Sequence, residues 1–170
     1  DYRAIKLQEN NIKIIEGDIN DEHVFNQIEN CDIVIACAAE SSAVAGFTES
    51  GAKNIIHSNI SGTIATINFC QRTKSKLIFF SSNRVYPYKA LAQLSIKEGS
   101  NKFELEKPIG IAEDFNLNGT KTLYGTSKYT SELIIQEYAD FHGLNSIINR
   151  FGVISGKGQL GSEEQGFVSL

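Results

Sequence analysis

The sequence predicts an α/β protein built on a doubly wound parallel sheet with helices on both faces. Two observations lead to this prediction. Apolar runs of strand length alternate along the chain with segments in which apolar residues recur at helical spacing. The strand runs are also continuously apolar, which is typical of strands buried on both faces of a parallel sheet. We therefore expect a ligand to bind beyond the carboxyl ends of these strands.

The predicted elements follow one another in a regular order. Continuous apolar runs predict strands at 12–15, 32–37, 77–80 and 144–150. Spacings of three and four predict helices at 20–30, 51–73 and 124–141, the last of them capped by Gly143. The region 87–122 has no clear period and is long for a connection, which favours a functional role, and residues 152–166 read as loop.

Composition indicates one globular domain and excludes several classes of function. The 170 residues contain no methionine, so we expect a piece of a longer chain. The net charge is −4 and no basic stripe is present, which argues against nucleic-acid binding. No apolar stretch approaches the length of a membrane-spanning helix, so no membrane partner is expected.

The cysteines and histidines are scattered. The three cysteines form no metal-binding or disulfide pattern and are interpreted as reduced thiols of a cytoplasmic protein: Cys31, Cys37 and Cys70. The three histidines lack metal-ligand spacing, and no metal site is predicted: His23, His57 and His142.

The stretch 124–128 carries the most chemical information. Tyr124 and Lys128 are four residues apart and therefore lie one turn from each other on the same helix face. An ammonium at that distance is expected to lower the pKa of the phenol and make it a usable proton acceptor at neutral pH. The strand at 77–80 leads into Ser81 and Ser82, whose hydroxyls are expected at the same end of the sheet.

Six segments, in order and at characteristic spacing, resemble the extended short-chain dehydrogenase/reductase family and its nucleotide-sugar epimerases and dehydratases: 16–19, 36–39, 59–63, 80–86, 124–128 and 150–156. The closest similarity is to the CDP-paratose 2-epimerase (tyvelose epimerase) branch, in segments 82–86, 111–115 and 149–166. The resemblance implies an incomplete Rossmann-like domain. Val153 and Ala36 depart from the family pattern, which usually has asparagine and histidine there.

The resemblance also implies roles for individual residues. The catalytic group would be Ser82, Tyr124 and Lys128. NAD would be held by Asp18, Ile19, Ala38, Ser41, Asn59, Tyr124 and Lys128. A nucleotide-diphosphate sugar would be bound by Ser82, Asn83, Arg84, Gln159 and Gln165. The full-length protein is expected to be a homo-oligomer.

Some parts of the family pattern are not found in this sequence. The phosphate-binding glycine turn and the acidic residue that reads the ribose would precede Asp1, so NAD and NADP are not distinguished directly, although the epimerase resemblance favours NAD. We interpret residues 1–170 as a partial dinucleotide-binding domain. It would carry a substrate-facing insertion at 87–122 and the start of a substrate loop at 156–170, and would be inactive by itself.

The predicted function is NAD-dependent epimerisation of a nucleotide-activated sugar, through transient oxidation and re-reduction. A dehydratase or a reductase of the same family is the first alternative. Asn83 and Arg84 stand where dehydratases of this family usually carry an Asp-Glu pair, which counts against dehydration. A non-catalytic dinucleotide-binding regulator is the second alternative, and the presence of both Tyr124 and Lys128 counts against it.

Overall fold

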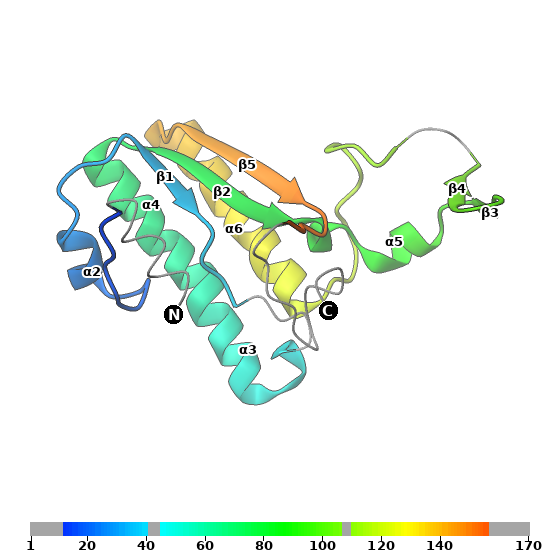
Figure 1. Ribbon diagram of the computed structural model, residues 1–170, viewed down its shortest axis with the longest axis horizontal. Helices are drawn as coiled ribbons and strands as arrows, with labels where there is room; N and C mark the ends of the chain where they lie inside the picture. Colours follow the sequence, from blue (N-terminus) through cyan, green and yellow to red (C-terminus); the bar gives the residue numbers. More distant parts are fainter. Residues whose placement is uncertain (1–11, 41–44, 107–109, 157–170) are drawn as a thin grey trace.

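The computed structural model describes residues 12–40, 45–106 and 110–156. Its centre is a parallel sheet of three strands in the order β1-β2-β5 (Figure 1). The strands are β1 (Ile33–Ala36), β2 (Lys76–Ser82) and β5 (Ser146–Phe151). All three lie where the apolar runs predicted strands, and the Rossmann-like parallel arrangement is confirmed.

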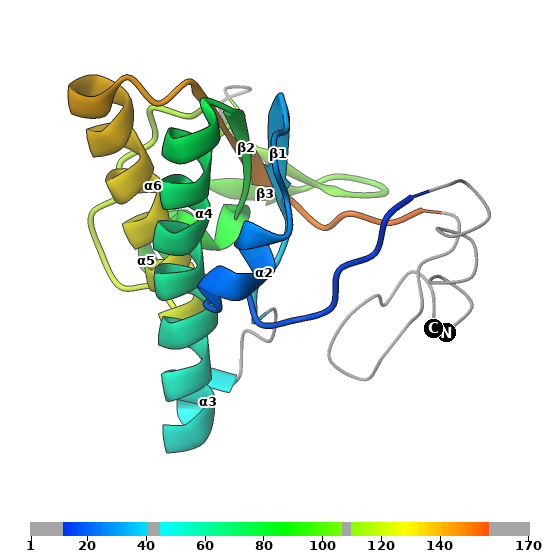
Figure 2. The same cartoon turned by 90° about the vertical axis from the view of Figure 1, so that its left-hand side faces the viewer.

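Two long helices, α4 (Gly62–Thr73) and α6 (Leu123–His142), pack side by side on one face of the sheet (Figure 2). α6 ends where predicted, since Gly143 adopts a left-handed conformation with φ of 68°. The core between helices and sheet is formed by buried apolar side chains: Ile67, Cys70, Leu77, Phe79, Ile135 and Leu144.

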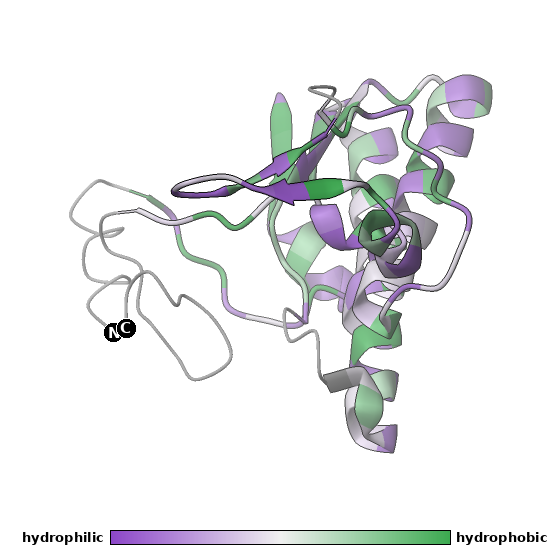
Figure 3. Ribbon diagram, turned by 90° about the vertical axis from the view of Figure 1, so that its right-hand side faces the viewer, coloured by the Kyte–Doolittle hydropathy of each residue, from purple (hydrophilic) through white to green (hydrophobic). Residues whose placement is uncertain are grey.

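The opposite face of the sheet is apolar and open among the described residues. Ile33, Ile35 and Ile147 are each more than half exposed there. Figure 3 shows the helices gathered on one side of the sheet, with the hydrophobic β1 ribbon facing away from them. In the described part of the chain, helices therefore cover one face of the sheet.

The segment predicted as one helix at 51–73 is continuous but not uniform. It consists of α3 (Glu49–Ile55), a π-helical stretch η2 (Ile56–Ser61) and α4. A short 3₁₀ turn, η1 (Ala45–Phe47), precedes it. The wider π turn contains Asn59, a buried polar residue, and π turns within α-helices frequently occur at functional sites.

Two predictions near the amino end were wrong. Residues 12–15 form no strand, and the helix predicted at 20–30 is only the five-residue α2 (Glu22–Asn26), capped by Asp21. A strand is stabilised by pairing, and in the described ranges no strand pairs with the outer edge of β1. α2 packs on α4 through the rings of Phe25 and Phe69, whose centroids are 5.2 Å apart.

The region 87–122 contains regular structure that its sequence pattern did not show. The turn η3 (Asn83–Val85) leads into α5 (Tyr88–Ala92) and then into an antiparallel hairpin of β3 (Ile96–Glu98) and β4 (Phe103–Leu105). The hairpin projects away from the sheet (Figure 1). Within the described ranges, no helix is long and apolar enough to cross a bilayer.

Gly125 sets how closely α6 approaches the end of β2. A Cβ at this position would lie 2.1 Å from the carbonyl oxygen of Arg84 in η3. Such a contact involves backbone and cannot be relieved by a rotamer change, so the glycine is required for η3 and α6 to touch.

We expect Gly125→Ala to lower the free energy of unfolding by about 1–3 kcal/mol, because the overpacked methyl forces η3 and α6 apart. Urea denaturation would measure the loss. Gly152→Ala is the matched control, since a Cβ there meets no atom within 4 Å. Equal stability of the two variants would contradict the close approach.

Candidate active site

The site is built where the first turns of α6 cross the carboxyl end of β2. Thr122 caps α6 by accepting a hydrogen bond from the Gly125 amide at 3.1 Å, which fixes where the helix begins. From that start, Tyr124, Lys128 and Glu132 follow at intervals of four residues and lie on one helix face. Each of the three contacts the last residues of β2.

Ser82 and Tyr124 are brought together as the sequence predicted. Ser82 lies beside the phenol of Tyr124, and its hydroxyl favours the phenolate and so acts to lower the pKa of Tyr124. Ser82 is held in place because its Oγ accepts the backbone N–H of Arg84 at 3.2 Å, as the cap of η3. A substrate hydroxyl at this position would meet two groups able to share its proton.

The expectation that Lys128 lowers the pKa of Tyr124 was wrong. The pKa of Tyr124 is raised, because burial of the phenol outweighs the hydrogen bond from Ser82 and the nearby charge of Arg84. The reason is the direction of Lys128, whose ammonium points toward the sheet. The phenol is therefore the stable form at neutral pH in this structure.

Lys128 is a buried cation with 3% of its surface exposed. Its Nζ donates to the carbonyl oxygen of Phe80 at 2.9 Å and lies 4.8 Å from the centre of the Phe79 ring. Burial lowers its pKa to about 8, and the neighbouring Cys37 thiol opposes this shift. The side chain therefore carries its charge at neutral pH but loses it under mildly alkaline conditions.

Asn59 supports the first turn of α6 through side-chain hydrogen bonds. Its side-chain amide donates to Ser127 Oγ at 2.9 Å, and Ser127 in turn donates to the carbonyl oxygen of Tyr124 at 2.8 Å. Its Oδ1 accepts the backbone N–H of Glu40 at 2.8 Å, in the segment that follows β1. Asn59 thus links the end of β1 to the first turn of α6.

The other predicted residues divide into three groups. Ala38 follows the end of β1, and Asn83 and Arg84 lie exposed in η3, all at the carboxyl edge of the sheet. Asp18 accepts two hydrogen bonds from Asn20, which lower its pKa, and lies 3.9 Å from His57 of η2. Ile19 packs on Gly62. Ser41, Gln159 and Gln165 lie outside the described residues.

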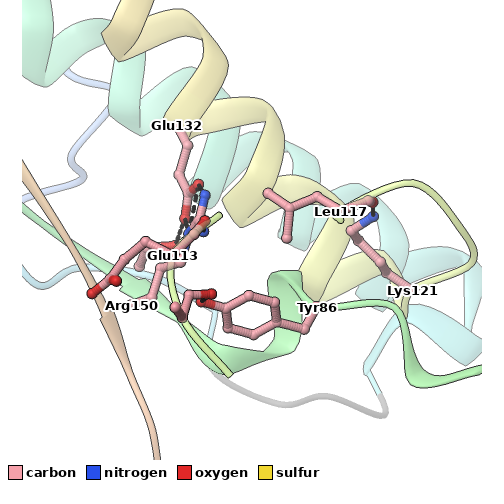
Figure 4. Close-up of polar contacts among 8 residues, drawn as sticks. Tyr86, Glu113, Leu117, Lys121, Glu132 and Arg150 are labelled. Atoms are coloured by element: carbon pink, nitrogen blue, oxygen red, sulfur yellow. Dashed lines mark hydrogen bonds and ion pairs between the residues drawn. The ribbon is translucent and has the colours of Figure 1, made fainter. Parts of the chain in front are cut away.

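The sequence interpretation missed a buried ion pair beside the site. Glu132 is fully buried, and both its oxygens accept from Arg150 Nε at 3.1 Å while Oε2 accepts from Nη2 at 2.8 Å (Figure 4). Ser81 donates to Oε1 at 2.5 Å. The available signal was a glutamate on the same helix face, eight residues after Tyr124.

Arg150 extends this network to the region 87–122. Its Nη1 donates to the carbonyl oxygen of Glu113 at 2.9 Å, and its guanidinium lies 5.4 Å from the centre of the Tyr86 ring (Figure 4). The glutamate hydrogen bonds raise the pKa of Arg150, so its charge is permanent. A pocket of about 720 Å³ opens beside the pair, between β5, α6 and the 111–113 segment.

One observation indicates that the residues of the site fit a nicotinamide dinucleotide. The ammonium of Lys128 has three donors at the carboxyl end of the sheet, and among the described residues it makes one hydrogen bond, to Phe80. The remaining donors are available to ribose hydroxyls. No group of three or more metal-ligating side chains occurs within the described ranges.

Comparison with known proteins supports the family assignment. A family model described as "Male sterility protein", for an NAD-binding domain, matches residues 2–169. The chain is 28% identical over 113 residues to CDP-paratose 2-epimerase of Salmonella typhi, which covers 65% of this chain and 32% of that protein. The chain thus spans about a third of the length of this curated relative.

Solved structures share the fold. UDP-glucose 4-epimerase from Thermotoga maritima matches with a TM-score of 0.67 and 22% identity, over 94% of this chain and 47% of the other. UDP-glucose 4-epimerase from Brucella ovis, in complex with NAD, matches with a TM-score of 0.67 and 23% identity, over 90% of this chain and 43% of the other. dTDP-glucose 4,6-dehydratase from Streptomyces venezuelae matches with a TM-score of 0.62 and 24% identity, over 82% of this chain and 38% of the other.

We expect the contribution of Lys128 to the unfolding free energy to rise with pH between about 8 and the ordinary lysine value of 10.5, while the raised pKa of Cys70 acts in the opposite direction. In that window the unfolded chain holds a proton on Lys128 that the folded chain has released, so this contribution increases with pH. The slope from this residue is at most about 1.4 kcal/mol per pH unit. Urea denaturation across the range should show that Lys128→Met loses this rise while the exposed Lys53→Met keeps it.

We expect Arg150→Met to cost about 3–5 kcal/mol of unfolding free energy, because it leaves the carboxylate of Glu132 buried without a counter-charge. The double variant Glu132→Leu, Arg150→Met removes both charges and should recover most of that loss. Denaturant titration of the single and double variants tests this. A double variant less stable than Arg150→Met alone would contradict it.

Proposed function

Because the chain belongs to the NAD-binding family described as "Male sterility protein", within the extended short-chain dehydrogenases/reductases, we propose that it is part of a nucleotide-sugar epimerase. The single observation that carries the proposal is the placement of Ser82 and Tyr124 next to each other, beside a buried Lys128, at the carboxyl end of a parallel sheet. This arrangement is suited to moving a proton on and off a sugar hydroxyl.

In the proposed reaction, the phenolate of Tyr124, which is the minor form at neutral pH in this structure, takes the proton of a ring hydroxyl and returns it after the carbon has changed configuration. Ser82 shares that proton and orients the substrate oxygen. Bound NAD supplies the hydride acceptor and returns the hydride, so there is no net redox change. Lys128 contributes a fixed cation and donors for the ribose, and its position is set by Phe80.

The activated sugar is proposed from the comparison with CDP-paratose 2-epimerase, together with the exposed guanidinium of Arg84 beside Tyr124. A guanidinium is suited to a diphosphate. We further propose that 87–122 faces the substrate, that 156–170 begins a substrate loop, and that the full-length protein forms a homo-oligomer in the cytoplasm.

We expect Tyr124→Phe in the full-length protein to retain NAD binding and to lose turnover by at least about 100-fold, because only the proton-transferring hydroxyl is removed. Calorimetric titration would measure NAD binding, and NMR of CDP-, UDP- and dTDP-sugars would follow epimerisation. Tyr129→Phe is the matched control on the same helix, beside Lys121 rather than Ser82.

Two outcomes would contradict the proposal. Undiminished turnover in Tyr124→Phe would remove the tyrosine from the chemistry. Accumulation of a reduced product with consumption of the dinucleotide would show that the reaction is a reduction. Accumulation of a dehydrated product would show that it is a dehydration.

A further inference from the structure

The face of α6 that carries Tyr124 and Lys128 continues into a buried polar chain that the proposed reaction does not use. Ser81, Glu132 and Arg150 form that chain, and it joins β2, α6 and β5. Glu132 has no exposed surface, and the side chain of Arg150 is 14% exposed. A buried ion pair of this kind is weak as a source of stability but restricts geometry strongly.

The restriction acts on the residue next to Ser82. Ser81 Oγ donates to Glu132 Oε1 at 2.5 Å, so α6 contacts both of the last two residues of β2. Ser81 is held by the carboxylate of α6, and Ser82 contacts Tyr124 of the same helix. Because Ser81 and Ser82 are joined by one planar peptide, a displacement of Ser81 also moves the backbone of Ser82.

The carboxylate itself has little freedom to move. Three hydrogen bonds from Arg150, at 2.8–3.1 Å, fix both its oxygens, and Arg150 is in turn held by the carbonyl oxygen of Glu113. The contacts therefore run from Glu113 through Arg150 to Glu132 (Figure 4) and from Glu132 to Ser81 at the end of β2.

We infer that Glu132 and Arg150 are positioning residues, which act through Ser81 to keep the Ser82 hydroxyl beside Tyr124. The effect on turnover rests on the proposed function. The effect on the position of Ser82 does not. Neither residue contacts Tyr124 itself by a hydrogen bond in the described part of the chain.

Ser81→Ala tests the inference without a change of charge. It leaves the Glu132–Arg150 pair intact and removes only the link to β2. Ser75→Ala is a matched control at the other end of the same strand. Ser75 is 4% exposed and Ser81 is 6% exposed, and each donates a hydrogen bond of 2.5 Å, Ser75 to the carbonyl oxygen of Cys31.

The first readout is the titration of Tyr124 itself, taken as the ultraviolet phenolate absorbance of each protein minus that of the same protein carrying Tyr124→Phe. The Ser82 hydroxyl acts to lower the pKa of Tyr124, so its displacement in Ser81→Ala should move the titration midpoint to higher pH. Ser75→Ala should leave the midpoint unchanged. A merely structural role of Ser81 would affect stability in both variants and the midpoint in neither.

The second readout is steady-state kinetics in the full-length protein. We expect Ser81→Ala to lower kcat about tenfold while KM changes less than about twofold, because the weakened contact acts on the proton in transit. Glu132→Asp is a second variant that keeps the charge for Arg150 but shortens the side chain away from Ser81. It should shift the Tyr124 midpoint in the same direction.

An unchanged Tyr124 midpoint in both Ser81→Ala and Glu132→Asp would overturn the inference. Absence of turnover in the wild-type protein with every sugar tested would instead contradict the proposed function. The titration would still report on the positioning of Ser82, so the two failures are distinguishable.

Discussion

The structure depends on the burial of two opposite charges along one helix where it crosses the end of a strand. Lys128 and Glu132 are one turn apart on α6, and both are almost completely withdrawn from water. Taking ions from water costs several kcal/mol each unless partners replace the solvent. The carbonyl oxygen of Phe80, the guanidinium of Arg150 and the hydroxyl of Ser81 are these partners. Helix, strand and β5 must therefore keep one relative position.

The position of Tyr124 follows from this packing. The ammonium of Lys128 is held against the sheet, so it cannot compensate for burial of the phenol, and the pKa of Tyr124 is raised. Ser82 and the charge of Arg84 partly oppose this effect. The chemistry of the site accordingly depends on how well the end of β2 is held, and less on the four-residue spacing between tyrosine and lysine.

A second set of polar contacts joins α6 to the π-helical stretch of its neighbour. The carbonyl oxygen of Asn59 accepts from Thr63 and Ser131 at 2.6 and 3.1 Å, and its amide reaches Ser127. These short side chains let two helices approach closely while keeping every buried donor occupied. The same contacts attach the segment after β1, through Glu40, to the helix that carries Tyr124.

The sequence by itself determined the parallel strands β1, β2 and β5, the extent of α6 and the grouping of Ser82, Tyr124 and Lys128. The elements depend on local periodicity and the Tyr124–Lys128 pair on a four-residue spacing, whereas Ser82 was placed with them because it ends a strand of the same sheet. Tertiary structure decided what spacing cannot express: that residues 12–15 lack a strand, that Lys128 faces Phe80, and that Glu132 meets Arg150. Pairing, burial and hydrogen bonding between distant segments set these outcomes, because the cost of a buried charge depends on its neighbours in space.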